Sequence, residues 1–258
     1  FHSDESNALC MNADLNDHPQ YTVNHEYKKG ADMTPKLYSF WRSSAAFRVR
    51  IALNLKGMDY EIIPVHLSKN GGEQTNEEYG NKNPNRLVPL FEEGEKSIHQ
   101  SLAIIEYLEE VKAEPPLLPT LAIDRAWVRS IAMDIACDIH PINNLRVLRY
   151  LIKQFGINNE AKDSWYAHWV QVGLGSLEKQ LSLDPRVGKF SYGDQPGLMD
   201  ICLIPQLFNA LSAKVNVSPY PTLMRIFDEC MQLPAFINAS WEKQVDAEGL
   251  NPVTPPKK

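Results

Sequence analysis

One segment decides the fold, Arg42-Ser43-Ser44-Ala45-Ala46-Phe47-Arg48-Val49-Arg50-Ile51-Ala52-Leu53. Two adjacent serines stand directly before apolar residues at helical spacing, and serine is a favoured residue at a helix N-terminus. Gly57 follows the apolar positions and is a typical C-terminal stop. The short apolar run 37–40 precedes the serines. We therefore predict a strand, then a helix that begins at the serines and runs on to Gly57.

The chain that follows predicts the rest of an α/β domain. A second strand is expected over 60–65, then a glycine-rich loop at 70–72 and a short helix near 74–79. Two further strands, 88–92 and 97–99, flank a tight Glu93-Gly94 turn, which is typical of a hairpin. Ser101 then opens another helix. This βαβ–α–ββα order predicts a thioredoxin-like domain over 36–114, with a mixed sheet that carries helices on both faces.

Beyond a proline-rich linker at 115–119, every segment is expected to be helical. Apolar residues at four-residue steps form a stripe from Ile123 to Ile139. Pro141 then kinks or ends that helix. The almost wholly apolar stretch 199–211 predicts a central buried helix. The fold class is therefore α/β plus all-α, with an all-helical domain over 120–248. Residues 1–35 are expected to be an N-terminal extension outside the fold, and 249–258 a tail.

Composition narrows the classes of function. The net charge is -6 and the sequence pI is near 5.7, so no broad electrostatic attraction to nucleic acid or an anionic membrane is expected. No apolar run is long enough to span a membrane. The four cysteines are scattered and show no metal-ligand spacing, so we expect buried free thiols and no metal. With no leader pattern visible, these features favour the cytoplasm.

The two serines at the helix start suggest a chemistry. Hydroxyls, free backbone N–H groups and the helix dipole can together stabilise an anion there, including a thiolate. The alternative is that Ser43 and Ser44 only cap the helix. The residues by themselves leave both interpretations open.

The same segment resembles the zeta class of glutathione transferases, whose motif is Ser-Ser-Cys-x-Trp-Arg-Val-Arg-Ile-Ala-Leu. Residues 43–53 match this motif except at Ala45 and Phe47, and the resemblance runs from Lys36 to Trp241. It includes the segments 87–90, 99–108 and 218–222. The resemblance implies a two-fold homodimer that binds glutathione and a small electrophile.

The resemblance also implies a set of site residues. Ser43 would act on the glutathione thiol, with Ser44 assisting. Val88, before a cis proline in the family, would offer backbone groups to glutathione. Glutathione would be bound by Ser43, Ser44, Ala45, Gln74, Val88, Gln100, Ser101, His140 and Asn144. The pocket for the second substrate would include Arg42, Arg146 and Ser212.

Several of these positions have plainer interpretations. Gln100 and Ser101 read equally well as a polar helix N-terminus. His140, four residues before Asn144, would share a face with it on an unbroken helix and could be merely structural. Asp200 is interpreted as a helix cap rather than a catalytic acid.

The leading functional hypothesis is the isomerisation of maleylacetoacetate to fumarylacetoacetate in tyrosine and phenylalanine catabolism. Alternatives are a general glutathione transferase with little isomerase activity and a non-catalytic glutathione-binding module. Thiol–disulfide exchange needs a cysteine at the start of the first helix, and residues 43–46 supply none. Ala45 stands where the family has cysteine, and Ser212 where it has arginine. Both departures predict a weaker isomerase than is typical of the class.

Overall fold

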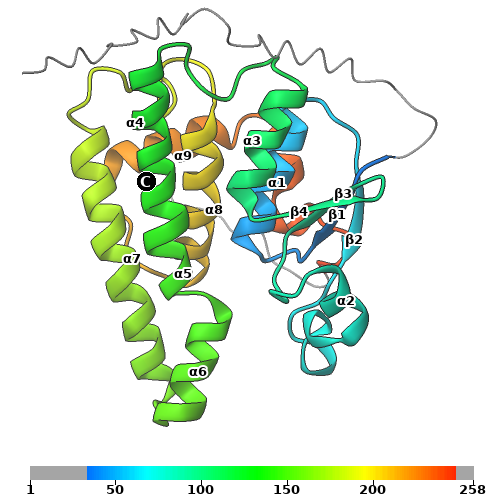
Figure 1. Ribbon diagram of the computed structural model, residues 1–258. Helices are drawn as coiled ribbons and strands as arrows, with labels where there is room; N and C mark the ends of the chain where they lie inside the picture. The colour runs from blue at the N-terminus through cyan, green and yellow to red at the C-terminus, as the bar shows by residue number, and fades with distance from the viewer. Residues whose placement is uncertain (1–33, 248–258) are drawn as a thin grey trace, which may run out of the picture. The chain divides into compact units, whose positions relative to one another are not determined.

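The structure is a computed structural model that describes residues 34–247. The predicted strand before Ser43 and Ser44 is present and lies in a four-stranded mixed sheet (Figure 1). The strand order is β2-β1-β3-β4, in which β1 pairs in parallel with β2 and antiparallel with β3, and β3 pairs antiparallel with β4. The expectations for residues 1–33 and 248–258 lie outside the described residues. The elements of this part are β1 (Lys36–Ser39), α1 (Ser44–Leu55), β2 (Glu61–Pro64), η1 (Lys69–Gly71), η2 (Glu73–Thr75), α2 (Glu77–Lys82), β3 (Leu90–Glu93), β4 (Lys96–His99) and α3 (Ser101–Val111).

Helices cover both faces of the sheet. Successive residues of a strand point to opposite faces, so each strand contributes side chains to the packing on both sides. Leu37 lies opposite Phe91, and both pack into the main core with α1 and α3. Their neighbours Tyr38 and Leu90 also pair, but pack on the other face with Tyr79 of α2. The predicted thioredoxin-like arrangement is confirmed.

The remaining described residues are helical apart from their connections. The elements are α4 (Ala122–Met133), η3 (Asp134–Ile139), α5 (His140–Ile142), α6 (Leu145–Phe155), α7 (Asn159–Leu181), α8 (Leu198–Ser212), α9 (Pro221–Cys230), α10 (Pro234–Ala239) and η4 (Trp241–Lys243). Helix α7 packs against η3, α6 and α9, and Figure 1 shows α6 beyond the lower end of α7. No helix of the described part is both long and apolar enough to cross a bilayer.

The segment that carries the predicted apolar stripe, from Ile123 to Ile139, is not one regular α-helix. The α-helical turns of α4 widen into a π-helix at η3 before α5 begins. Ile135 and Ile139 are buried, but Ile123 is 74% exposed, so the stripe is wrong at its first position. Gly173 of α7 makes room for the π-helix, because a Cβ there would lie 2.3 Å from Cδ1 of Ile139.

Helix α8 is the buried central helix that its composition predicted. Asp200 caps its start, since Oδ2 accepts from the backbone N–H of Gly197 at 2.8 Å. Oδ1 accepts from the N–H of Ser191 at 2.9 Å. The interpretation of Asp200 as a cap is confirmed. Among the cysteines, Cys202 and Cys230 are buried free thiols as expected, whereas Cys137 is exposed, because η3 turns it outward.

Helix α1 is held between the two parts of the fold. It contacts α3 on its own side and α8 and α10 on the helical side. The guanidinium of Arg50 is fully buried and donates to Ala239 O at 2.9 Å and to Ser39 Oγ at 2.9 Å. It also donates to Trp41 O at 3.2 Å. Arg50 therefore ties the middle of α1 to groups from both ends of the described chain.

Candidate active site

Ser43 is the N-cap residue of α1. Its Oγ accepts from the backbone N–H of Ala46 at 3.2 Å, as the capping interpretation predicts. A hydroxyl has one proton to donate besides the lone pairs with which it accepts. Within residues 34–247, the Ser43 O–H donates to no protein acceptor, and Ser43 is only half-buried. The first turn of α1 holds no acidic side chain. Ser43 can therefore cap the helix and still donate to an anion.

Ser44 is buried, and its hydroxyl is engaged by α8. Its Oγ donates to Pro205 O at 3.4 Å and accepts from the side-chain amide of Asn209. These contacts join the first turn of α1 to the central helix. The assisting role of Ser44 stays a prediction, and its described contacts are structural.

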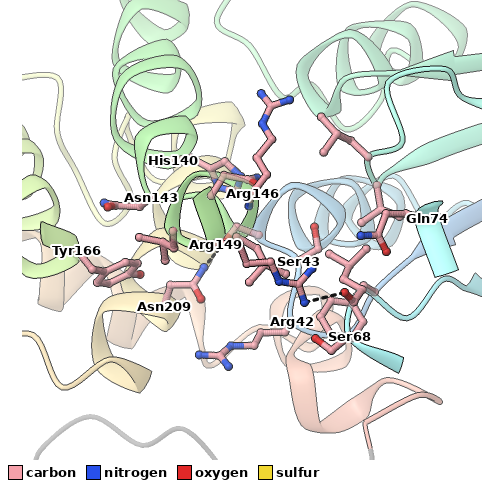
Figure 2. Close-up of a pocket in the computed structure, with 18 of the residues that line it drawn as sticks. Arg42, Ser43, Ser68, Gln74, His140, Asn143, Arg146, Arg149, Tyr166 and Asn209 are labelled. Atoms are coloured by element: carbon pink, nitrogen blue, oxygen red, sulfur yellow. Dashed lines mark hydrogen bonds between the residues drawn. The ribbon is translucent and has the colours of Figure 1, made fainter. Parts of the chain in front are cut away.

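A cleft of about 1160 Å³ opens at the start of α1. It is lined by α1, the segments 66–68 and 85–88, and parts of α5 to α8 (Figure 2). Most of the predicted site residues border it: Arg42, Ser43, Ser44, Gln74, Val88, His140, Asn144, Arg146 and Ser212. Ala45, Gln100 and Ser101 do not. The structure thus brings nine of the predicted residues to one cleft.

Gln100 and Ser101 instead form the corner between β4 and α3. Gln100 has a φ of 74° and occupies the N-cap position without a capping side-chain hydrogen bond. Ser101 is buried, and its Oγ accepts from the Nη1 of Arg48 at 3.3 Å. This hydrogen bond places the corner beside α1, one turn beyond Ala45. The predicted polar helix N-terminus is present, but no side chain closes it.

Two residues of the glutathione prediction border the cleft from the α/β part of the chain, Gln74 and Val88. The peptide bond between Val88 and Pro89 is cis, as the resemblance implied. The side-chain oxygen of Gln74 is buried without a partner among the described residues. Gly72, with a φ of 104°, leaves room for the Gln74 amide, because a Cβ there would lie 2.6 Å from its nitrogen and oxygen.

His140 and Asn144 both border the cleft but do not share a helix, in keeping with the kink or end expected at Pro141. Helix α5 ends at Ile142, and Asn144 becomes the N-cap of α6, accepting from the N–H of Arg146 at 3.1 Å. Burial of the His140 imidazole, helped by the charges of Arg48 and Arg146, lowers the pKa of this histidine to about 3. His140 is therefore neutral near pH 7.

Sequence reasoning missed three polar residues of the cleft. Both side-chain polar atoms of Asn143 are buried without a partner in the described part. Tyr166 of α7 borders the same space, and burial raises the pKa of its hydroxyl to about 12. Asn209 faces the cleft from α8 (Figure 2). One signal was available, since Gln206 and Asn209 are polar residues three apart in the middle of a largely apolar helix.

The cleft is basic although the chain is acidic. Its charged lining residues are arginines or lysines, with Asp163 as the exception. Arg149 of α6 also joins the helical side of the cleft to the segment 66–68, because its Nη2 donates to Leu67 O at 3.1 Å (Figure 2). The basic lining residues are Arg42, Arg86, Arg146, Arg149, Lys153, Lys162 and Lys214. This lining favours small anions. Residues 34–247 hold no cluster of three or more His, Cys, Asp or Glu side chains that could bind a metal ion.

Comparison with known proteins agrees with this geometry. Residues 33–110 match the family model for the glutathione S-transferase N-terminal domain. A probable maleylacetoacetate isomerase of Vibrio cholerae is 47% identical over 211 residues, which cover 82% of this chain and 97% of that protein. A holo structure of a maleylpyruvate isomerase, described as a bacterial zeta-class glutathione S-transferase, superposes with a TM-score of 0.80 at 43% identity. That alignment covers 82% of this chain and 99% of the other.

A second solved structure adds a ligand-bound relative. The maleylacetoacetate isomerase of Methylobacterium extorquens AM1, with bound malonate and glutathione, has a TM-score of 0.80 and 38% identity. The alignment covers 83% of this chain and 100% of that one. Identity at this level along nearly the whole of each relative exceeds a likeness of fold. The chain belongs to the zeta class of the glutathione S-transferases, the family of the maleylacetoacetate isomerases.

Proposed function

We propose that this protein is a glutathione-dependent isomerase that converts maleylacetoacetate to fumarylacetoacetate. The observation that carries the proposal is the hydroxyl proton of Ser43, which no acceptor within residues 34–247 takes, at the N-terminus of α1 beside a basic cleft. When bound, glutathione supplies a thiolate that adds reversibly to the cis double bond and leaves after rotation, so it is regenerated. The protein's task is to hold that thiolate and the acid beside it.

Ser43 stabilises the thiolate. A free thiol has a pKa of about 8.5, and lowering it by about two units takes roughly 2.7 kcal/mol. A hydrogen bond to a charged group contributes about 1.5–3 kcal/mol, and a helix N-terminus adds about 0.3–1 kcal/mol. Together, the hydrogen bond and the helix N-terminus can supply the free energy that this pKa shift requires.

Polar groups near the start of α1 and at the start of α3 are suited to bind the parts of glutathione other than its thiol. The unpartnered oxygen of Gln74 and the uncapped start of α3 are polar groups that a peptide ligand could satisfy. We assign glutathione to Ser43, Ser44, Ala45, Gln74, Val88, Gln100, Ser101, His140 and Asn144. His140, kept neutral, can hydrogen-bond without adding charge.

Arg42 and Arg146 are assigned to the carboxylates of maleylacetoacetate, and Ser212 is assigned to the same second-substrate pocket. Arginine suits this role because its planar fork matches a carboxylate. Asn143 and Tyr166 supply neutral polar groups for the carbonyl oxygens of the acid. Since Ser212 stands where the resemblance expects arginine, Arg149 is a further candidate for a carboxylate.

The finer assignments belong to the same proposal. We assign glutathione binding to a domain over 36–114 and most of the second-substrate pocket to a helical domain over 120–248. A two-fold homodimer in the cytoplasm, acting in tyrosine and phenylalanine breakdown, is the setting this reaction would require.

An activity comparison tests the proposal. Purified protein is given maleylacetoacetate with and without glutathione, beside maleylpyruvate and a panel of generic electrophiles. Isomerisation that requires glutathione and exceeds conjugation of the generic electrophiles supports the proposal. Ala45 and Ser212 favour one alternative, a general transferase, which would instead conjugate the panel and isomerise poorly. Retention on glutathione resin without any turnover would indicate a binding module.

A further inference from the structure

Arg48 of α1 is a buried cation whose hydrogen-bonding capacity is largely unused. It is 2% exposed, and its Nη1 donates to Ser101 Oγ at 3.3 Å. Its Nε and Nη2 have no partner within residues 34–247. A buried guanidinium with so few hydrogen bonds is costly unless a negative charge lies nearby.

Arg50, two residues on, shows what the fold does with a purely structural arginine. Its guanidinium is equally buried, yet its Nε, Nη1 and Nη2 all donate to protein oxygens. Backbone carbonyls and the Ser39 hydroxyl accept its hydrogen bonds. Arg48 lacks such a set. The difference sets Arg48 apart from the arginine that holds α1 in place.

No neighbouring group neutralises Arg48. None of the ion pairs of the described residues includes it. Burial raises the pKa of the Cys202 thiol to about 11, and His140 is neutral, so neither side chain supplies a negative charge. An unpaired buried charge is strongly unfavourable, and an anion nearby would relieve it.

The place for that anion is the start of α3. Ser101, which is part of that corner, accepts from Arg48, and α3 begins there with no capping side chain and no acidic residue in its first turn. Because Ser101 Oγ accepts from Arg48, its own proton points away from the guanidinium. The corner therefore presents a hydroxyl donor and free N–H groups, with a positive charge behind them.

We propose that Arg48 is a positioning residue for glutathione: it orients the Ser101 hydroxyl and balances the charge of the γ-glutamyl α-carboxylate bound at the start of α3. This inference rests on the proposed function. Arg48 does not touch the ligand in this arrangement. It acts through Ser101 and through its charge.

The test compares two ligands, glutathione and 4-aminobutyryl-cysteinylglycine, which lacks only the α-carboxylate. Dissociation constants are measured by calorimetry for the wild type, Arg48→Met and Arg48→Lys. Arg48→Met should weaken glutathione binding by about tenfold to a hundredfold and leave the analogue within about twofold. Arg48→Lys keeps the charge and should retain most of the affinity.

A double-mutant cycle locates the effect. In a Ser101→Ala background, Arg48→Met should weaken glutathione much less than it does alone, since the relay is already broken. Lys56→Gln is the matched control, because Lys56, at the C-cap of α1, is also a buried cation but is paired with Glu109 at 2.5 Å. It should lower the melting temperature and leave the ratio of the two dissociation constants unchanged.

Each result is decisive. If wild-type protein does not bind glutathione, the proposed function fails. If the wild type binds but Arg48→Met weakens both ligands equally, or neither, only this inference is overturned. Should Arg48→Met not fold, Arg48→Gln is measured in its place, with the same selective loss expected. If neither variant folds, Arg48 is structural and the inference is wrong.

Discussion

Removing the Ser43 hydroxyl separates the two tasks that the structure gives this residue. As the N-cap of α1, its Oγ accepts from the N–H of Ala46. As the proposed donor to the thiolate, it supplies a proton that no described acceptor takes. Replacing an N-cap serine by alanine costs about 1 kcal/mol of stability, whereas replacing it by glycine costs only a few tenths. Both replacements remove the hydroxyl completely.

Ser43→Ala and Ser43→Gly should therefore differ in stability and agree in activity. The lost hydrogen bond to a charged group is worth about 1.5–3 kcal/mol, or about a tenfold to hundredfold loss of kcat/KM. The pKa of bound glutathione, followed by ultraviolet titration, should rise by about one to two units in both variants. Urea denaturation would report the difference between them.

The matched control is Asn158→Ala. Asn158 caps α7, where its Oδ1 accepts from Ala161 N at 2.8 Å, and it does not border the cleft. This variant should lose about 1 kcal/mol of stability and keep its turnover. If Ser43→Gly turns over at the wild-type rate while Ser43→Ala does not, the cap alone explains Ser43 and the thiolate role is refuted.

Three further predictions follow from the cleft and its support. Ser212→Arg and Ala45→Cys should each raise the kcat/KM for isomerisation, by up to about tenfold to a hundredfold, while the dissociation constant of glutathione stays constant. No gain from either variant would make these departures irrelevant. Because the folded pKa of His140 is about 3, below its unfolded value of about 6.5, the folded state binds fewer protons. Stability should therefore fall as pH drops from about 6.5 toward 3, by up to about 2 kcal/mol at pH 5, and His140→Gln should flatten that part of the denaturation profile. Gly173→Ala should destabilise by about 1–3 kcal/mol, because the new Cβ meets Ile139, and adding Ile139→Ala should relieve the clash. Equal melting temperatures for the wild type and Gly173→Ala would contradict this packing.

The sequence predicted best what depends on neighbouring residues. The cap at Ser43, the hairpin around Gly94 and the cap at Asp200 each follow from the chemistry of a few adjacent positions, and all three are present. The fold class follows from the order of such elements. The candidate site residues at the start of α1 could be named for the same reason, since they stand in one short motif, and Arg42, Ser43 and Ser44 border the cleft.

The missed features depend on distant residues. The π-helix reflects how Ile139 packs on Gly173, 34 positions along the chain, which no spacing rule contains. The contact between Arg48 and Ser101 likewise joins residues 53 apart. Periodicity marks an apolar face, but it does not say which polar residue of the opposite face lines a cleft.

The hydrogen bonds of Arg50 have a consequence for the order in which this protein can be completed as it is synthesised. The α/β part leaves the ribosome first, and domains usually fold as they emerge. Yet the Nε of Arg50 donates to Ala239, near the end of the described chain, and α10 covers α1. Until residue 239 has been added, the Nε of Arg50 lacks its acceptor, although Nη1 and Nη2 can already donate to Ser39 and Trp41, and one side of α1 is uncovered. The nascent α/β part therefore waits, incompletely packed, for almost the whole chain, and that interval is when a chaperone would have most to protect.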